Sequence, residues 1–211
     1  MQNPPTPYQS AIRLLFILIH GSEQFSTSDG SGAKGIFRGE TRLHAMDFWV
    51  RYPDYLAYEL ISIFQETGEV SLLNYAELIF EDQEPDLRRI PMMRYRFGAY
   101  DRIDNTLSVL VSKGLVRQEG KKKVDGIQEY HYLIMPSAYS KIDEISKEFP
   151  VLSWYEERAK LVAKVAGSRG GAALKNRQYK HISYASTSGG SIIPPITEEV
   201  QQKLQSLKNR I

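Results

Sequence analysis

The stretch from Tyr100 to Met135 constrains the fold of this chain more than any other part. Between Asp101 and Lys113, apolar side chains recur on one face of a helix, at Ile103, Leu107, Leu110 and Val111. Gly114 follows, and glycine readily adopts the left-handed conformation that ends a helix. Residues 115–119 and 127–134 then alternate apolar and polar side chains around a glycine-bounded turn rich in lysine. The stretch therefore predicts a helix followed by a β-hairpin with a basic tip.

A helix that ends at glycine and leads into such a hairpin is the outline of a winged helix. The basic side chains of the hairpin are candidates for contact with a DNA phosphate backbone, where each neutralised phosphate adds affinity and salt sensitivity. These candidates are Arg117, Lys121, Lys122 and Lys123. A solvated turn, with Glu119 and Asp125 offsetting the positive charge, explains the same residues equally well.

The helix before the hairpin is not well suited to reading bases. Arg102 and Asn105 have the side chains to reach base edges, but Asp101 and Asp104 occupy the first turn, which normally approaches DNA. Carboxylates at a helix N-terminus stabilise the helix and would repel phosphates. We therefore expect this winged helix to serve structure or protein contact rather than operator recognition.

The rest of the chain predicts a mainly α protein with a small β-hairpin. We expect a helical N-terminal lobe over residues 1–84, a winged-helix lobe over residues 91–166, a flexible basic Gly/Ser-rich linker over residues 167–196, and an amphipathic C-terminal helix over residues 197–211. The expected helices are residues 8–20, 40–52, 53–65, 71–80, 101–113, 137–149 and 153–166, and residues 92–97 are expected to be extended. Residues 21–39 read as a polar loop, and Ser153 and Glu156 as a capping box.

Within residues 40–52, the polar side chains fall on one narrow line at Glu40, His44, Asp47 and Arg51. Apolar side chains cover most of the remaining circumference, so this helix is expected to be packed on most sides and to expose one ridge. Asp47 and Arg51 are four residues apart and are expected to pair along that ridge.

The strongest electrostatic feature lies near the C-terminus, because no acidic residue occurs between Arg158 and Ile196. This segment predicts a basic arm that touches nucleic acid or an acidic partner. Its candidate nucleic-acid contacts are Arg169, Lys175, Arg177 and Lys180. The alternative is a soluble linker that binds neither nucleic acid nor a partner.

The last helix is expected to be capped by Thr197 and to carry an apolar stripe. The stripe and its preceding staple residue are candidates for a helix-in-groove contact with a partner, at Ile196, Val200, Leu204 and Leu207.

Several classes of function find no support in the sequence. The chain has no cysteine and a net charge of only +2, which excludes disulfides, thiolate chemistry and a general polyanion binder. Its four histidines are scattered, and no G-x-S-x-G elbow occurs. Gly30–Gly35 matches a dinucleotide-binding string but lacks the surrounding βαβ context. The longest apolar run, Leu14–Ile19, is too short for a membrane span or a signal peptide. We expect no enzyme, no cofactor, no metal and no membrane contact, which fits a cytoplasmic protein.

The segment Arg42–Ala57, with the sequence RLHAMDFWVRYPDYLA, resembles a motif of the middle component of ABC-three-component systems. These bacterial defence operons include the Lamassu type. The resemblance implies a subunit that works beside an SMC-like ATPase and an effector, often a nuclease. A winged-helix lobe after the motif is similar to the tandem winged-helix accessory subunits of SMC complexes. In that setting Asp47 and Arg51 belong either to a fixed corner between helices or to a surface facing the ATPase.

These observations lead us to expect a non-enzymatic accessory subunit of an SMC-like defence ATPase, which also helps to hold DNA without sequence preference. The main alternative is a stand-alone, dimeric winged-helix transcriptional regulator. A small enzyme built on the loop Gly30–Gly39 is a third class, but it would need a nucleotide site that the sequence does not provide.

Overall fold

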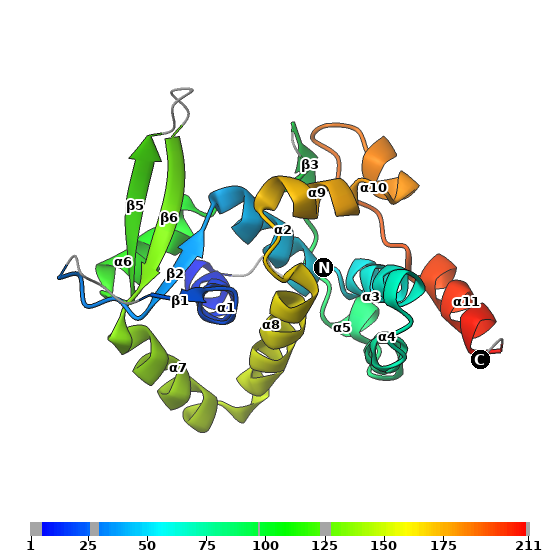
Figure 1. Ribbon diagram of the computed structural model, residues 1–211, viewed down its shortest axis with the longest axis horizontal. Helices are drawn as coiled ribbons and strands as arrows, with labels where there is room; N and C mark the ends of the chain where they lie inside the picture. The colour runs from blue at the N-terminus through cyan, green and yellow to red at the C-terminus, as the bar shows by residue number, and fades with distance from the viewer. Residues whose placement is uncertain (1–5, 26–29, 97, 123–127, 210–211) are drawn as a thin grey trace. The chain divides into compact units, whose positions relative to one another are not determined.

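The computed structural model describes residues 6–25, 30–96, 98–122 and 128–209. It is mainly helical, with 63% helix and 13% strand, and it contains a small antiparallel sheet, as the sequence predicts. The chain forms two compact units (Figure 1). Unit 1 combines Met1–Asp47 with Arg102–Gly171, and unit 2 combines Phe48–Asp101 with Ala172–Ile211.

This division differs from the predicted consecutive lobes, 1–84 and 91–166. The chain leaves unit 1 within a helix, after Asp47, returns to it at Arg102, and leaves it again after Gly171. The spacing of apolar residues reports which neighbours lie on one element. It does not report which distant elements pack together, so the lobes could not be assigned from it.

Unit 1 contains a four-stranded antiparallel sheet in the order β1-β2-β6-β5. Its strands are β1 (Glu23–Gln24), β2 (Gly35–Arg38), β5 (Val116–Lys122) and β6 (Gln128–Ile134). The hairpin of β5 and β6 is the one predicted after Gly114, and Figure 1 shows it beside β2. Strand β2 corrects the prediction of a loop, because Ile36 and Phe37 are buried and pair with Leu133 and Tyr132 of β6.

Helix α1 is the centre of unit 1 and contacts the three other helices that belong wholly to this unit. The helices are α1 (Pro7–His20), α6 (Asp104–Ser112), α7 (Pro136–Glu148) and α8 (Ser153–Ala166). Thr6 and Gln9 form a capping box at the start of α1. Gly114 adopts the expected left-handed conformation, with φ of 65°, just after α6.

Two local expectations in this unit are wrong. Helix α6 begins at Asp104, three residues later than predicted. The capping box at Ser153 does not form, because the 3-10 helix Pro150–Leu152 runs directly into α8 and puts Leu152 at the N-cap.

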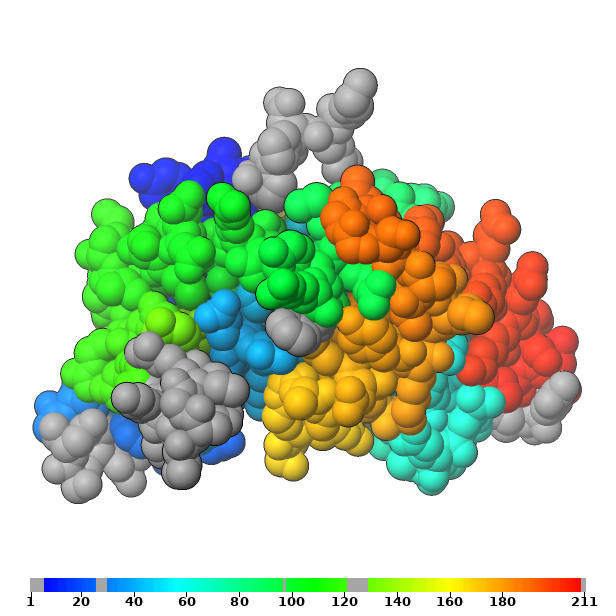
Figure 2. Space-filling view, turned by 90° about the horizontal axis from the view of Figure 1, so that it is seen from above, coloured from blue at the N-terminus to red at the C-terminus, as the bar shows by residue number. Residues whose placement is uncertain are grey.

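Unit 2 is built on helices α3, α4 and α11. Its elements are the end of α2 (Glu40–Arg51), α3 (Pro53–Thr67), α4 (Ser71–Glu81), α5 (Glu84–Leu87), β3 (Met93–Tyr95), β4 (Gly98–Tyr100), α9 (Gly171–Gln178), α10 (Ile182–Ser186) and α11 (Thr197–Lys208). Proline opens α3 and left-handed Gly68 closes it, as the sequence predicts. Figure 2 shows α11, in red, against the cyan surface of α3, which it contacts.

The segment expected to be a flexible linker, residues 167–196, is instead structured. It contains α9 and α10, and it continues along β3, where Ile192 bridges Met93. Tyr184 anchors it: this ring is fully buried, its oxygen accepts a hydrogen bond from Ala99 N–H at 2.6 Å, and its hydroxyl lies 3.2 Å from Gln178 Oε1. The glycines and serines of residues 167–196 suggested a linker. A few buried side chains are nevertheless enough to hold most of this segment against the rest of unit 2.

Among the helices of the described ranges, none has both the length and the apolar character that a bilayer crossing requires.

Candidate functional site

The second part of the Arg42–Ala57 motif, from Phe48 on, forms a corner of unit 2 where α2 ends and α3 begins. Arg51 is 4% exposed and its guanidinium donates three hydrogen bonds to one region of the chain. Nε lies 3.0 Å from Ile90 O, Nη2 lies 2.6 Å from Pro91 O, and Nη1 lies 2.7 Å from Asp101 Oδ2. Arginine has five donors in a fixed plane and suits such multiple contacts. Arg51 therefore holds the segment after α5 against the end of α2.

Tyr52 connects the same corner to two distant segments. Its hydroxyl oxygen accepts a hydrogen bond from Met92 N–H at 3.0 Å, and the hydroxyl lies 2.9 Å from Ile193 O. Burial raises the pKa of Tyr52, so its hydroxyl keeps its proton and donates to that carbonyl.

Asp54 in the first turn of α3 performs a similar role for the start of α11. Its Oδ2 accepts hydrogen bonds from Ile196 N–H at 2.7 Å and from the Thr197 hydroxyl at 3.3 Å, and its Oδ1 accepts one from Tyr55 N–H at 3.0 Å. Burial raises the pKa of Asp54, while these donors favour its charged form. Thr197 thus bonds Asp54 and makes no cap of its own helix.

We expect Asp54→Ala to lower the free energy of unfolding by about 2–3 kcal/mol, because it leaves buried donors such as Ile196 N–H without an acceptor. Chemical denaturation monitored by circular dichroism measures this change. Asp143→Ala, which removes an exposed carboxylate from α7, is the control and should change the stability by less than about 0.5 kcal/mol. Equal effects of the two variants would contradict a bonding role for Asp54.

The polar line of α2 is not an exposed ridge, contrary to the sequence prediction. His44, Asp47 and Arg51 are all buried. Asp47 is 0% exposed and its Oδ1 accepts a hydrogen bond from Arg13 Nε of α1 at 2.7 Å. Charged side chains are rarely buried unless paired, so periodicity alone assigned them to the surface. Asp47 and Arg51, both candidate partner contacts, instead hold their own units together.

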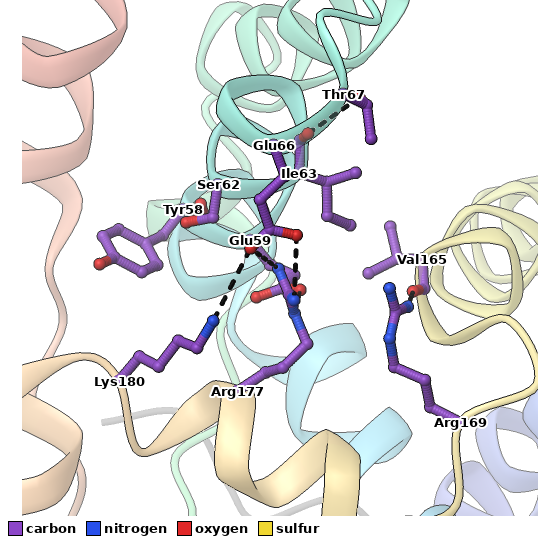
Figure 3. A network of polar contacts seen from close by, with 10 residues as sticks. All are labelled: Tyr58, Glu59, Ser62, Ile63, Glu66, Thr67, Val165, Arg169, Arg177 and Lys180. Atoms are coloured by element: carbon purple, nitrogen blue, oxygen red, sulfur yellow. Dashed lines mark hydrogen bonds and ion pairs between the residues drawn. The ribbon is translucent and has the colours of Figure 1, made fainter.

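Arg177 of α9 lies in a cluster of carboxylates (Figure 3). Its guanidinium pairs with Glu59 and also with Glu66, whose oxygens lie 3.1 and 3.2 Å from Nη2 and Nη1. Lys180 Nζ lies 3.7 Å from Glu66. The pKa of Arg177 is raised, because these carboxylates outweigh the burial that lowers it. Arg177 and Lys180, both candidate nucleic-acid contacts, therefore already face acidic partners within unit 2.

Charge complementarity within unit 2 explains this arrangement. Residues 48–101 have twice as many acidic as basic side chains, whereas residues 172–211 have three times as many basic as acidic ones. Lys208 of α11 also pairs with Glu77 of α4. The basic excess that suggested an arm for nucleic acid thus meets the acidic helices of its own unit. Both charge excesses are visible in the sequence, but the sequence does not indicate that Glu59 and Glu66 pair with Arg177.

The other two basic candidates of this segment are less exposed than expected. Arg169 donates from Nη1 to Val165 O at 2.9 Å, near the end of α8 (Figure 3). A basic side chain commonly binds the last carbonyls of a helix in this way. Lys175 is half-buried in α9.

The hairpin candidates are neighbours in the sequence. Arg117 of β5 is exposed and forms an ion pair with Glu119 at 2.6 Å. Lys121 and Lys122 are the last residues of β5. Lys123 lies outside the described residues.

The apolar stripe of α11 is not exposed for a partner. Ile196, Val200 and Leu204 are buried within unit 2, and Leu207 is half-buried. Because α11 packs on α3 and α4, its amphipathic pattern is explained by its own unit.

The described residues contain no group of three or more histidine, aspartate or glutamate side chains arranged to hold a metal ion. His20 is the last residue of α1, and its burial lowers the pKa of its imidazole; Glu156 opposes this shift and Lys160 adds to it. His20 therefore tends to stay neutral in the folded protein.

We expect His20 to make the fold less stable in acid. The unfolded chain takes up a proton near the ordinary pKa of 6.5, whereas the folded protein does so only at lower pH, so the free energy of unfolding falls as the pH drops through this interval. Denaturation series between about pH 7.5 and pH 5 should show a smaller loss for His20→Gln than for the unchanged protein. Identical pH profiles would exclude His20 as the cause.

No protein-family model, curated protein or solved structure matches this chain.

Proposed function

We propose that this chain is a non-catalytic accessory subunit of a bacterial SMC-like ATPase complex in anti-plasmid or anti-phage defence. In this role it bridges the ATPase and an effector nuclease and helps to hold DNA. The proposal starts from the resemblance of Arg42–Ala57 to the middle component of such systems. Because these complexes act on intracellular DNA, the proposal includes a cytoplasmic location.

We assign unit 1 to the winged-helix fold, interrupted by an insertion. Support comes from the order of its elements: α1, β2, the first part of α2, then α6, β5 and β6. The sheet order supports the same assignment, because β2 lies beside β6 and extends the hairpin. In this assignment residues 48–101 are inserted between the second and third helices of the winged helix.

The observation that carries the accessory role is the outward surface of α6, which would be the recognition helix. Its exposed side chains include Asp104, Asn105, Ser108 and Ser112, and no lysine or arginine occurs between 104 and 112. A helix that enters the major groove usually places cations or amides against phosphates and bases. A neutral to acidic surface of this kind fits protein contact better than operator binding.

DNA contact in this proposal is centred on the hairpin. Arg117, Lys121, Lys122 and Lys123 carry the local positive charge there. Arg177 and Lys180 already face Glu66, so they are secondary candidates. Contacts to phosphates alone give binding without sequence preference.

Replacing Lys121, Lys122 and Lys123 together by alanine should weaken binding to a mixed-sequence duplex by about tenfold at low salt. The plot of log affinity against log salt concentration should become shallower by roughly 0.9 for each lost phosphate contact. Fluorescence anisotropy over a salt series measures both effects. Lys147→Ala, an exposed cation on α7, is the control. An unchanged slope in the triple variant would remove the hairpin from DNA binding.

Co-expression with an SMC-like ATPase encoded by an adjacent gene tests the proposed function. We expect the two proteins to purify together and to stay together through size-exclusion chromatography. Purification of this chain without the ATPase, combined with a footprint on a palindromic promoter site, would overturn the proposal. That result would favour a stand-alone dimeric regulator.

A further inference from the structure

Unit 1 contains an apolar groove that the sequence did not reveal. It lies between α1, α6 and α7 and has a volume of about 380 Å³. Its apolar lining includes Ala11, Ile12, Leu15, Val109, Leu110 and Ile145. Ala11, Leu15 and Leu110 are buried and form its floor, while Ile12, Val109 and Ile145 are half-buried.

One wall of the groove is an apolar stripe of α1. Tyr8, Ala11, Ile12 and Leu15 contribute one stripe of α1 at spacings of three and four residues, about two helical turns long. The small side chain of Ala11 leaves room for close approach. Tyr8 is 68% exposed on this stripe, so a large aromatic surface is available for contact. Amphipathic helices bind such grooves through apolar residues spaced three, four and seven apart.

The charged residues that line the groove indicate which charges a bound helix would carry. Lys113 and Lys141 line the groove, and none of the described lining residues carries a carboxylate. Lys141 also pairs with Glu144 at 2.6 Å, but this pair is exposed and therefore contributes little. Acidic side chains on the flanks of the bound helix would face these lysines. A second copy docked groove to groove would instead bring lysine against lysine.

We infer that this groove is the docking site for an amphipathic helix with acidic flanks, supplied by a partner subunit. The inference rests on the proposed function, because an accessory subunit needs a surface for its partner and the stripe of α11 is buried. It extends the proposal by assigning that surface to α1, α6 and α7, and by specifying the chemistry of the segment that binds there.

The test uses two labelled helical peptides of about 15 residues with the same leucine stripe, one flanked by glutamate and one by lysine. We expect the glutamate peptide to bind the full-length chain about three- to tenfold more tightly in fluorescence anisotropy, because its flanks attract Lys113 and Lys141 while lysine flanks repel them. Val109→Glu and Lys113→Glu should each abolish this preference. Ser112→Glu, an exposed residue of α6 outside this groove, is the matched control.

Circular dichroism checks that each variant folds, and Lys113→Glu changes a side chain that is exposed. Equal binding of both peptides, or binding that survives Val109→Glu and Lys113→Glu, would overturn the inference. Binding of an apolar dye in the groove, without binding of either peptide, would indicate a cavity for small molecules. That result would also overturn the inference. None of these results depends on the ATPase. If the proposed function is wrong, the chain will not co-purify with the ATPase, whereas the preference for the glutamate peptide can remain.

Discussion

Phe48→Ala should lower the free energy of unfolding of unit 2 by about 3–5 kcal/mol, the usual cost of removing a buried aromatic ring. The Phe48 ring is fully buried, and its centroid lies 4.7, 5.0 and 5.1 Å from the rings of Tyr52, Tyr55 and Tyr184. The substitution leaves a cavity among Tyr52, which precedes α3, Tyr55 of α3 and Tyr184 of α10. Chemical denaturation followed by circular dichroism measures the loss.

Hydrogen exchange locates the effect of Phe48→Ala. Peptides from α3 and α10 should exchange faster, because the missing ring packs against both helices. Ile182→Ala is the control: this side chain also belongs to α10 but is 76% exposed, so its loss should cost less than about 0.5 kcal/mol. A similar loss in both variants would mean that the aromatic cluster does not hold unit 2 together.

Arg13→Met should lower the free energy of unfolding of unit 1 by about 3–5 kcal/mol. Arg13 is buried with Asp47, and its removal leaves the carboxylate of Asp47 without its 2.7 Å partner in a site closed to water. Breaking one half of a buried ion pair is strongly destabilising because the remaining charge is desolvated. Faster hydrogen exchange should appear in α1 and α2, which carry the two members of the pair.

Arg38→Met is the matched control for Arg13→Met. Arg38 also pairs with a carboxylate, Glu23, at 3.2 Å, but both side chains are largely exposed. Exposed pairs contribute about 0–1 kcal/mol, so the control should stay within that range. Equal costs for Arg13→Met and Arg38→Met would show that burial of the Arg13–Asp47 pair is unimportant.

The two units and the groove change where a partner would be sought. The residues that resemble a defence-system motif, Arg51, Tyr52 and Asp54 among them, bond to their own unit. In our proposal, the residues of this motif form a structural corner, and the partner docks in the apolar groove on unit 1. The hairpin of β5 and β6 and the groove are lined by different residues of unit 1, so the proposed DNA binding and the proposed docking are separately testable.

The sequence by itself determined several limits of the main helices and the hairpin. Proline and glycine marked the limits of α3 at Pro53 and Gly68, and Gly114 separated α6 from the hairpin. These signals are local, because backbone conformation and the spacing of apolar side chains depend on near neighbours in the chain. The same local signals predicted the hairpin of β5 and β6.

Only the tertiary structure decided how distant segments combine. It paired β2 with β6, buried Asp47 against Arg13, and brought Arg177 to Glu59 and Glu66 across more than a hundred residues of sequence. A charged side chain reads as exposed until its partner is known, and a Gly/Ser-rich segment reads as a linker until its buried anchors are known. Such pairings depend on complementary shape and charge between elements that are far apart in the chain, which residue spacing does not record.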